Sequence, residues 1–331
     1  MMSAVRRHPD LRALLLGLAV LSLAAGCIGI RTDSDAPVDQ TSPGRWTHLT
    51  PVPTTRQEVA TAALGTRLVV IGGFDESAEP VDAVEAYDPE TNAWEPLAPY
   101  PMAVHHAAAV TVGDRLFVIG GYTGGRLQWT ALNEVHEYVP GHNRWEARAS
   151  MPTGRGALAA AVLGGRVHAL GGAVGSPLNS HEVYDPAANR WTRANAMPTA
   201  RDHLAAVAFG GRVWAIGGRS SFFGTQYPNV EVYDPATDSW QTGPPLPAGR
   251  GGLAAVAFRD RILVFGGETS TRIFSATEMY EVAGNRWIAK EPMPTPRHGM
   301  GAAVLGDRVH VIAGGTRPGF AATPAHEAYV P

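Results

Sequence analysis

The stretch RLFVIGGY, residues 115–122, decides the fold, because it ends an apolar run of four residues in two adjacent glycines. Close copies of it occur as RVWAIGGR at residues 212–219 and as RILVFGGE at residues 261–268. Recurrence of one segment at a regular distance indicates a repeat protein, in which each unit buries its apolar face against the next unit. The other landmarks of the chain follow the same period.

Six tryptophans recur at intervals of 48, 51, 46, 49 and 47 residues, namely Trp46, Trp94, Trp145, Trp191, Trp240 and Trp287. A proline lies seven residues after each tryptophan, and a glycine doublet lies nineteen residues after each of the first five prolines. Ala313-Gly314 takes the place of the doublet in the sixth copy. A tyrosine precedes each later tryptophan by seven residues, and Tyr329 is the sixth. The segment from doublet to tyrosine varies between 13 and 18 residues, so variation concentrates there.

Each repeat predicts four short strands. An Ala/Val run (strand a) is followed by a tight turn, and the apolar stretch that ends in the glycines follows as strand b. The alternating Val-Glu-x-Tyr pattern predicts strand c, and the tryptophan lies on strand d. Glycine suits the end of strand b because it permits backbone angles and close approaches that side chains forbid.

The doublet, the tyrosine, the tryptophan and the Met-Pro-x-x-Arg segment together resemble kelch repeats, and the resemblance covers residues 45–331. It implies an all-β fold, a six-bladed kelch-type β-propeller with four antiparallel strands per blade. The chain ends at Val330-Pro331, just after a strand c, and the repeats begin at Trp46, on a strand d. The N-terminal strand is therefore expected to complete the last blade and close the ring.

The N-terminus carries a targeting pattern. Arg6, Arg7 and Arg12 precede an apolar segment, and Leu23-Ala24-Ala25-Gly26-Cys27 looks like a bacterial lipobox. We expect residues 1–26 to be a lipoprotein signal peptide, Cys27 to be lipidated, and residues 28–44 to form a flexible tether. A plain secretory signal with an incidental cysteine is the alternative. The pattern predicts a bacterial kelch-repeat lipoprotein, membrane-anchored on the extracytoplasmic side of the cell envelope.

Composition limits the partners. The net charge is 27 − 30 = −3, which argues against nucleic acid. Cys27 is the single cysteine, so no intrachain disulfide forms, and kelch-type copper-radical oxidases, which need a Tyr–Cys crosslink, are excluded. We expect a monomer without a cofactor.

The variable b–c loops share one face with the d–a loops, and loops on a rigid scaffold are where recognition concentrates. The b–c loops carry aromatic and basic candidates for ligand binding: Phe74, Tyr122, Arg126, Trp129, Arg219, Phe222, Phe223, Tyr227, Arg272, Phe274, Arg317 and Phe320. Such residues are typical interface anchors, and aromatic rings also stack on sugars. Some of them are equally expected to pack inward against their own loop.

The residues that begin strand a differ between blades, so the repeat does not dictate them. They include Gln57, His105, Asp202 and His298, and His106, His203 and Glu58 follow in the chain. These side chains suit ligand binding, and His105, Asp202 and His298 are weak catalytic candidates. One side chain per blade rarely closes a metal shell, so a polar channel mouth without a metal is expected. The neighbouring arginines, such as Arg56 and Arg297, belong to the repeat and are expected to be structural.

Two functions remain open. The first is a lipid-anchored binding or scaffold propeller that recognises a protein or a glycan through the b–c and d–a loop face. The alternative is a sugar-directed enzyme of the mutarotase or epimerase kind, since some bacterial kelch propellers are sugar mutarotases. We favour a binding module over an enzyme.

Overall fold

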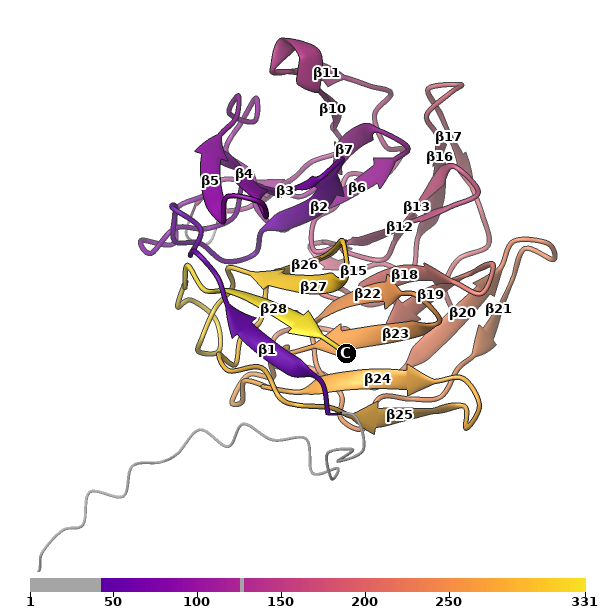
Figure 1. Ribbon diagram of the computed structural model, residues 1–331. Coiled ribbons are helices and arrows are strands. Elements are labelled where there is room, and N and C mark those ends of the chain that lie inside the picture. Colours follow the sequence, from indigo (N-terminus) through magenta and orange to yellow (C-terminus); the bar gives the residue numbers. More distant parts are fainter. Residues whose placement is uncertain (1–42, 126–127) are drawn as a thin grey trace, which may run out of the picture. The chain divides into compact units, whose positions relative to one another are not determined.

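The computed structural model describes residues 43–125 and 128–331, which form six four-stranded antiparallel sheets arranged as blades around one axis (Figure 1). The predicted signal peptide, Cys27, residues 28–42 of the predicted tether, and Arg126 lie outside the described residues. Within the described residues, no helix combines the length and the apolar character needed to cross a membrane. The all-β, six-bladed architecture predicted from the repeats is confirmed.

The strands follow the order a–b–c–d from the axis outward. Blades 1 and 2 consist of β2 (Ala60–Leu64), β3 (Arg67–Ile71), β4 (Val84–Asp88), β5 (Ala93–Pro96), and β6 (Ala108–Val112), β7 (Arg115–Ile119), β10 (Val135–Val139), β11 (Arg144–Ala147). Blades 3 and 4 consist of β12 (Ala159–Leu163), β13 (Arg166–Leu170), β16 (His181–Asp185), β17 (Arg190–Arg193), and β18 (Ala205–Phe209), β19 (Arg212–Ile216), β20 (Val230–Asp234), β21 (Ser239–Thr242). Blades 5 and 6 consist of β22 (Ala254–Phe258), β23 (Arg261–Phe265), β24 (Thr277–Glu281), β25 (Arg286–Ala289), and β26 (Gly301–Leu305), β27 (Arg308–Ile312), β28 (His326–Val330), β1 (Arg45–His48).

Two b–c loops contain small hairpins of their own. Blade 2 adds β8 (Tyr122–Thr123) and β9 (Thr130–Ala131), and blade 3 adds β14 (Ala173–Val174) and β15 (Ser176–Pro177). A 3₁₀ turn, η1 (Pro140–His142), forms the c–d turn of blade 2. Both hairpins lie at the end of the blades where the variable loops gather, so they extend that face.

The N-terminal strand closes the ring. β1 pairs antiparallel with β28, and Trp46 lies opposite Tyr329. The Pro43 carbonyl accepts hydrogen bonds from the Tyr329 hydroxyl and from the Glu291 amide, both at 2.8 Å. These bonds hold Pro43 and Gly44, the last residues of the predicted tether, against the propeller. Strand β1 thus adds the fourth strand to blade 6, next to β28, and closes the ring.

The middle strands are buried on both faces because each blade packs face to face against its neighbours. In β7, Leu116, Phe117, Val118 and Ile119 are all buried. The following doublet, Gly120-Gly121, has φ values of 58° and 99°. A Cβ on Gly120 would lie 2.6 Å from the Arg155 carbonyl of the next blade. Glycine is required here because the chain turns left-handed while it touches its neighbour.

The tyrosines and tryptophans of the repeat join neighbouring blades. Tyr138 and Trp145 form a cross-strand pair in blade 2, with ring centroids 5.1 Å apart. Trp145 Nε1 donates to the Ala98 carbonyl of the preceding blade at 3.0 Å, and the Tyr138 hydroxyl donates to Asn143 Oδ1 at 2.8 Å. Asn143 Oδ1 also accepts from the Ala98 amide at 2.8 Å. These residues therefore have structural roles, as predicted.

The repeat arginines are structural too. Five of the six blades bury an arginine that is fully inaccessible to solvent and pairs with a glutamate of strand c: Arg56–Glu85, Arg155–Glu182, Arg201–Glu231, Arg250–Glu278 and Arg297–Glu327. Blade 2 has Val104 in place of the arginine and His136 in place of the glutamate. There the Tyr100 hydroxyl and His136 Nδ1 form a hydrogen bond at 2.9 Å instead. Both partners of the ion pair are absent together, so no charge is left buried alone.

Candidate ligand-binding site at the propeller mouth

Backbone pairing fixes the geometry of the mouth. The residues expected to begin strand a lie three positions before it, and in every blade this residue forms an antiparallel bridge with the residue directly after the doublet. We call the first set the mouth positions and the second set the bridge partners. The pairs are Gln57–Phe74, His105–Tyr122, Gly156–Ala173, Asp202–Arg219, Gly251–Glu268 and His298–Gly315. Each b–c loop is thereby held against the d–a loop of its own blade, and side chains from both loops lie around one opening.

One residue further along each blade, six residues form a closed ring around the axis. Each amide donates to the carbonyl of the preceding blade's residue at 2.7–3.0 Å, and the members of this inner ring are Glu58, His106, Ala157, His203, Gly252 and Gly299. All six are left-handed, with φ between 52° and 64°. This conformation costs a non-glycine residue about 1–2 kcal/mol. Glycine meets the same requirement without that cost, so the ring itself does not explain the side chains of Glu58, His106 and His203.

An open cavity of about 400 Å³ lies above the inner ring, within the size range of small-molecule sites. Its lining residues come from blades 1, 2, 4, 5 and 6, and they include Gln57, Glu58, His106, Tyr122, Trp129, Asp202, His203, Arg219, Phe222, Glu268, His298 and Phe320. Blade 3 contributes none of them, because its mouth and ring positions are Gly156 and Ala157. We call this cavity the mouth pocket.

Charged groups form a continuous network on the floor of the mouth pocket. Arg219 Nη1 donates to Glu268 Oε1 at 2.8 Å, and Arg219 Nε lies 3.5 Å from Asp202 Oδ1. His203 Nδ1 is 2.6 Å from the same Asp202 oxygen. His298 lies between two carboxylates, with Nε2 3.4 Å from Glu58 Oε1 and Nδ1 3.5 Å from Glu268 Oε2. The network gives the floor both hydrogen-bond donors and acceptors.

Burial controls the ionisation of the histidines near this floor. Desolvation lowers the pKa of His105 to about 3, against a smaller opposing effect of its hydrogen bond to Gly124. Desolvation also holds the pKa of His106 well below its usual value, and the neighbouring titratable rings of His203 and His105 act in the same direction. For Asp202, burial favours the neutral acid, but His203 and Arg219 outweigh it and lower the pKa. At neutral pH, His105 and His106 are therefore neutral and Asp202 is ionised.

Aromatic side chains form the walls of the pocket. Trp129 and Phe320, 38% and 49% exposed, lie on one side around the buried Phe74, whose centroid is 5.7 Å from Trp129 and 5.3 Å from Phe320. Phe222 lies over the Arg219 guanidinium at 5.1 Å on the side of blade 4. Tyr122 completes the wall and donates its hydroxyl to the Ala173 carbonyl at 2.8 Å. The walls are therefore apolar and the floor is polar.

The structure brings many of the candidate residues predicted from the sequence into this pocket. Its lining includes eleven of them, namely Gln57, Glu58, His106, Tyr122, Trp129, Asp202, His203, Arg219, Phe222, His298 and Phe320. Gln57 bonds the blade 6 loop through the Gly319 carbonyl at 2.6 Å and the Ala321 amide at 2.7 Å, so it also holds Phe320 in place.

The other predicted residues lie elsewhere. Phe74 and Phe274 are buried inside their loops, and Arg272 stacks on Phe274 at 4.5 Å. Phe223, at 86% exposed, lies outside the mouth pocket, as do Tyr227 and the exposed Arg317. His105 does not line the pocket either. Its ring stacks on Phe74 at 3.9 Å, and its nitrogens contact His106 and the Gly124 carbonyl.

Sequence reasoning missed Glu268, which is almost fully buried and contacts both Arg219 and His298. A signal for it exists in the chain, since Glu268 directly follows a doublet, as do the predicted Phe74, Tyr122 and Arg219. Sequence reasoning also singled out His105 as a catalytic candidate, whereas its neighbour His106 faces the pocket.

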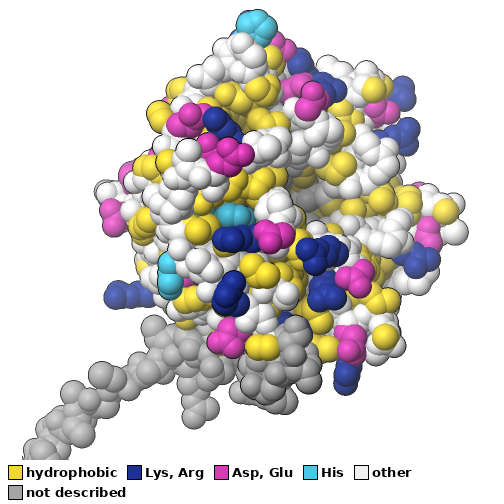
Figure 2. All heavy atoms as spheres, in the orientation of Figure 1, with side chains coloured by type: hydrophobic (Ala, Val, Ile, Leu, Met, Phe, Trp, Pro, Cys, Tyr) yellow, Lys and Arg dark blue, Asp and Glu magenta, His cyan; other side chains and the backbone are white. Residues whose placement is uncertain are grey.

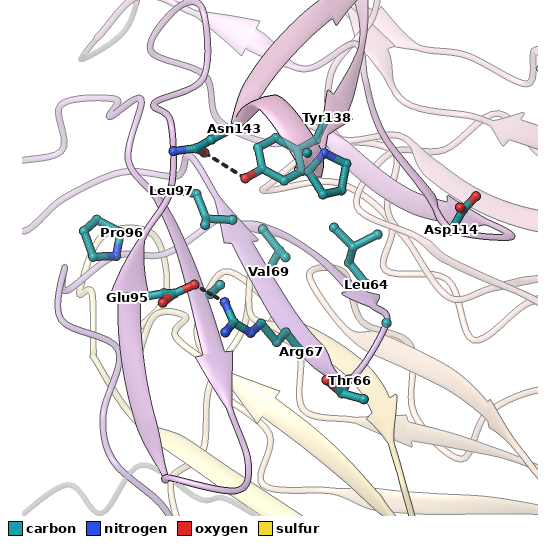
Figure 3. Close-up of a pocket in the computed structure, with 14 residues that line it drawn as sticks. Leu64, Thr66, Arg67, Val69, Glu95, Pro96, Leu97, Asp114, Tyr138 and Asn143 are labelled. Carbon is teal, nitrogen blue, oxygen red and sulfur yellow. Dashed lines mark hydrogen bonds and ion pairs between the residues drawn. The ribbon is translucent and has the colours of Figure 1, made fainter.

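A larger hollow of about 830 Å³ opens between blades 1 and 2, at the opposite ends of the strands (Figure 3). Its walls include Leu64, Val69 and Tyr138, whose hydroxyl bonds Asn143, and Arg67 pairs there with Glu95. Similar wedges lie between blades 3 and 4 and between blades 6 and 1. Because the same repeat residues produce this wedge at several blade junctions, the hollow reflects the splaying of the blades.

On the face shown in Figure 2, acidic and basic side chains lie side by side.

The fold and the mouth pocket define a six-bladed β-propeller with a ligand-sized cavity on its loop face. The model of the KLHDC2/KLHL20/DRC7 Kelch-repeats domain matches residues 31–218, and the Kelch motif model matches residues 200–247 and 249–294. The chain therefore belongs to the kelch-repeat family. A comparison with curated proteins finds no match. Among solved structures, one described as "Structure of YjhT" is similar with a TM-score of 0.73 and 17% identity, over 84% of this chain and 95% of that chain.

Proposed function

We propose that this kelch propeller is a binding protein whose mouth pocket holds a sugar residue of a glycan. The observation that carries the proposal is the pocket itself, in which Trp129, Phe222 and Phe320 surround a floor of hydrogen-bonding groups. Aromatic faces pack against the C–H faces of a sugar ring, while carboxylates accept from its hydroxyl groups and Arg219 donates to its oxygens. A cavity of about 400 Å³ accommodates one or two sugar rings.

Kelch propellers typically bind proteins, and a protein partner would use this face differently. A stable protein interface covers about 800 Å² per partner and is centred on exposed aromatic anchors. Phe223 is the most exposed large apolar residue described, yet it lies outside the pocket. It therefore separates the two kinds of ligand: a protein that covers the loop face contacts Phe223, and a sugar held inside the pocket does not.

The proposal includes a lipid anchor on the extracytoplasmic side of the membrane. Its support is the sequence alone, through the lipobox-like segment that ends at Cys27. A propeller held close to a membrane surface is well placed to bind glycans of the cell envelope, since a short flexible tether restricts it to a thin layer.

The test measures saccharide binding to the full chain, with a panel of envelope-derived mono- and oligosaccharides and isothermal titration calorimetry. Phe222→Ala and Trp129→Ala should each weaken binding about 10-fold, the equivalent of about 1.4 kcal/mol of lost contact. Val174→Ala, at an exposed residue of the blade 3 loop outside the pocket, is the control and should bind like the wild type. If no saccharide binds, and Phe223→Ala instead removes a protein partner captured from the host, the glycan proposal is wrong.

A sugar-directed enzyme is the second candidate, and the position of His298 favours it. This imidazole lines the pocket, where its Nε2 donates to the Gly319 carbonyl at 3.1 Å and its Nδ1 faces Glu268 Oε2 at 3.5 Å, so the ring can exchange a proton with that carboxylate. Mutarotation needs one group to protonate the ring oxygen and another to accept the proton of the anomeric hydroxyl. Proton NMR of anomer exchange tests this candidate: His298→Gln should reduce the rate to the uncatalysed rate while the sugar still binds. A wild-type rate equal to the uncatalysed rate would exclude it.

A further inference from the structure

The inner ring presents three electron-pair donors to one another. Glu58, His106 and His203 each offer a ligand atom, and these three atoms lie within 4.8 Å of one another. The cluster is shielded from solvent, with side-chain exposures of 10%, 4% and 10%. Single side chains from different blades were expected to lie too far apart to share a metal, but the ligand atoms of these three blades lie close together.

The hydrogen bonds around His106 determine which of its nitrogens is available. A carbonyl oxygen only accepts, so His105 Nε2 donates to Gly124 O at 3.2 Å, and the tautomer with its proton on Nε2 carries a lone pair on Nδ1. His106 Nδ1 lies 2.6 Å from that atom and must donate to it. His106 Nε2 therefore holds a lone pair, and it faces Glu58 Oε2 at 3.3 Å.

His203 is oriented in the same way by a carboxylate. Its Nδ1 donates to Asp202 Oδ1 at 2.6 Å, and the tautomer with its proton on Nδ1 carries a lone pair on Nε2. A carboxylate bonded to the far nitrogen of an imidazole is the usual support of a metal-binding histidine, because it fixes the tautomer and raises the basicity of the ligating nitrogen. Asp202 is itself held by Arg219.

The charge of the floor also calls for a cation. Three buried carboxylates, those of Glu58, Asp202 and Glu268, lie beside the single guanidinium of Arg219. Counting only the carboxylates and the guanidinium, the sum is −3 + 1 = −2. Buried charge is normally paired or bound to a metal, and a divalent ion balances this sum.

We propose that Glu58, His106 and His203 form a binding site for a divalent transition metal, with zinc as the reference ion. Two imidazole nitrogens and one carboxylate are a common ligand set for Zn²⁺, with bonds of about 2.0–2.2 Å. Tetrahedral ligands at that length lie about 3.3–3.6 Å apart, and the His106 Nε2 to Glu58 Oε2 distance of 3.3 Å falls at the short end of this range.

The rest of the ring leaves room for the remaining coordination positions. Ala157, Gly252 and Gly299 have little or no side chain, and the ligand residues line both the channel cavity of about 150 Å³ and the mouth pocket. A Cβ on Gly299 would lie 2.5 Å from Glu58 Oε1, so glycine at this position makes room for the carboxylate. A metal here faces the mouth pocket and can bind an oxygen of a ligand. The inference does not depend on that ligand being a sugar.

The test uses the full chain, purified without a polyhistidine tag, stripped of metal with a chelator and titrated with ZnCl₂ and CoCl₂. We expect one ion per chain with a dissociation constant below about 1 µM, and visible Co²⁺ bands typical of four- or five-coordinate nitrogen and oxygen ligation. His106→Gln and Glu58→Gln should weaken binding at least 100-fold. Asp202→Asn should weaken it 10–100-fold, because it releases His203.

Two controls keep the test decisive. His142→Gln removes an exposed histidine of a c–d turn and should leave binding unchanged. Glu58→Gly and His203→Gly place in the ring the residue that Gly252 and Gly299 already provide, so these variants should fold, with an unchanged circular dichroism spectrum, and lose the metal. Absence of stoichiometric binding to the wild type, or wild-type affinity in the folded glycine variants, overturns the proposal. Either result leaves the saccharide titration unaffected, so the two proposals fail separately.

Discussion

Breaking one buried ion pair of the repeat should destabilise the whole propeller. In blade 3, Arg155 is fully buried and donates to Glu182 at 2.5 Å, to the Thr153 carbonyl at 2.9 Å and to the Ala169 carbonyl at 3.1 Å. Burial lowers the pKa of Arg155, and the glutamate opposes that shift. Glu182→Gln leaves the guanidinium with neutral partners only, which costs about 3–5 kcal/mol of unfolding free energy.

Blade 2 shows how the same position is stable without charge, through Tyr100, Val104 and His136. Transplanting this set into blade 3, as Met151→Tyr, Arg155→Val and Glu182→His, removes both charges together. Replacing a buried pair by well-packed residues is often neutral, so the triple variant should recover to within about 1–2 kcal/mol of the wild type. The order of stability should therefore be wild type, triple variant, and then Glu182→Gln.

Thermal melting and urea titration of the three proteins measure these differences. At about 2–4 °C per kcal/mol for a chain of this size, Glu182→Gln should lower the melting temperature by about 10 °C. Glu95→Gln is the matched control, because it breaks the half-exposed Arg67–Glu95 pair and should change stability by less than about 1 kcal/mol. A Glu182→Gln protein that melts within 2 °C of the wild type, or a triple variant no more stable than it, refutes the reasoning.

Three further predictions concern closure, pH and anchoring. Trp46→Ala removes the ring contact with Tyr329 at 4.9 Å and the hydrogen bond to the Glu291 carbonyl. Limited proteolysis should therefore cleave the terminal blade of this variant earlier than it cleaves the Trp145→Ala control. Equal cleavage patterns would contradict the closure model. Burial lowers the pKa of His168 and of His181 to about 4 in the folded protein. Their contribution to the free energy of unfolding is therefore complete above pH 6.5 and is lost as the pH falls toward 4, because the unfolded chain takes up protons first. The loss reaches about 2 kcal/mol per histidine at pH 5. Replacing both by glutamine should flatten the fall of the melting temperature between pH 7 and 5, and an unchanged slope would refute this assignment. Cys27→Ser should abolish incorporation of an alkyne-tagged fatty acid by the host, and persistent labelling would show that the lipid lies elsewhere.

The repeat made the fold predictable because each landmark has a local physical cause. The doublets are left-handed turns that touch the next blade, and the closing role of Trp46 followed from where the strands begin and end. The structural role of the repeat arginines was predictable, but their glutamate partners were not. That Val104 and His136 replace both members of one pair became clear once the register of the strands placed them side by side.

The site was less predictable because the mouth combines residues that differ between blades. Non-uniformity at the mouth positions identified Gln57, Asp202 and His298, but sequence distance could not show that His106 faces the axis and that His105 turns away. That choice depends on the left-handed backbone of His106, with a φ of 54°, which reverses the direction expected for an extended strand. The sequence did not indicate a role for Glu268, because a lone acidic residue in a short loop is usually solvated. In the structure, Glu268 is buried and contacts Arg219 and His298.

The inner ring links the fold to the proposed metal site. Every blade needs a left-handed residue at this point, because the six amides and carbonyls bond one another around the axis. Glycine satisfies that need in blades 5 and 6, and a large polar side chain in the same conformation costs about 1–2 kcal/mol. Glu58, His106 and His203 therefore accept a conformational cost three times over at positions where the scaffold gains nothing from their side chains. Strain that the fold does not require is typically retained at functional sites, and here it gathers an imidazole pair and a carboxylate beneath a cavity lined by five blades.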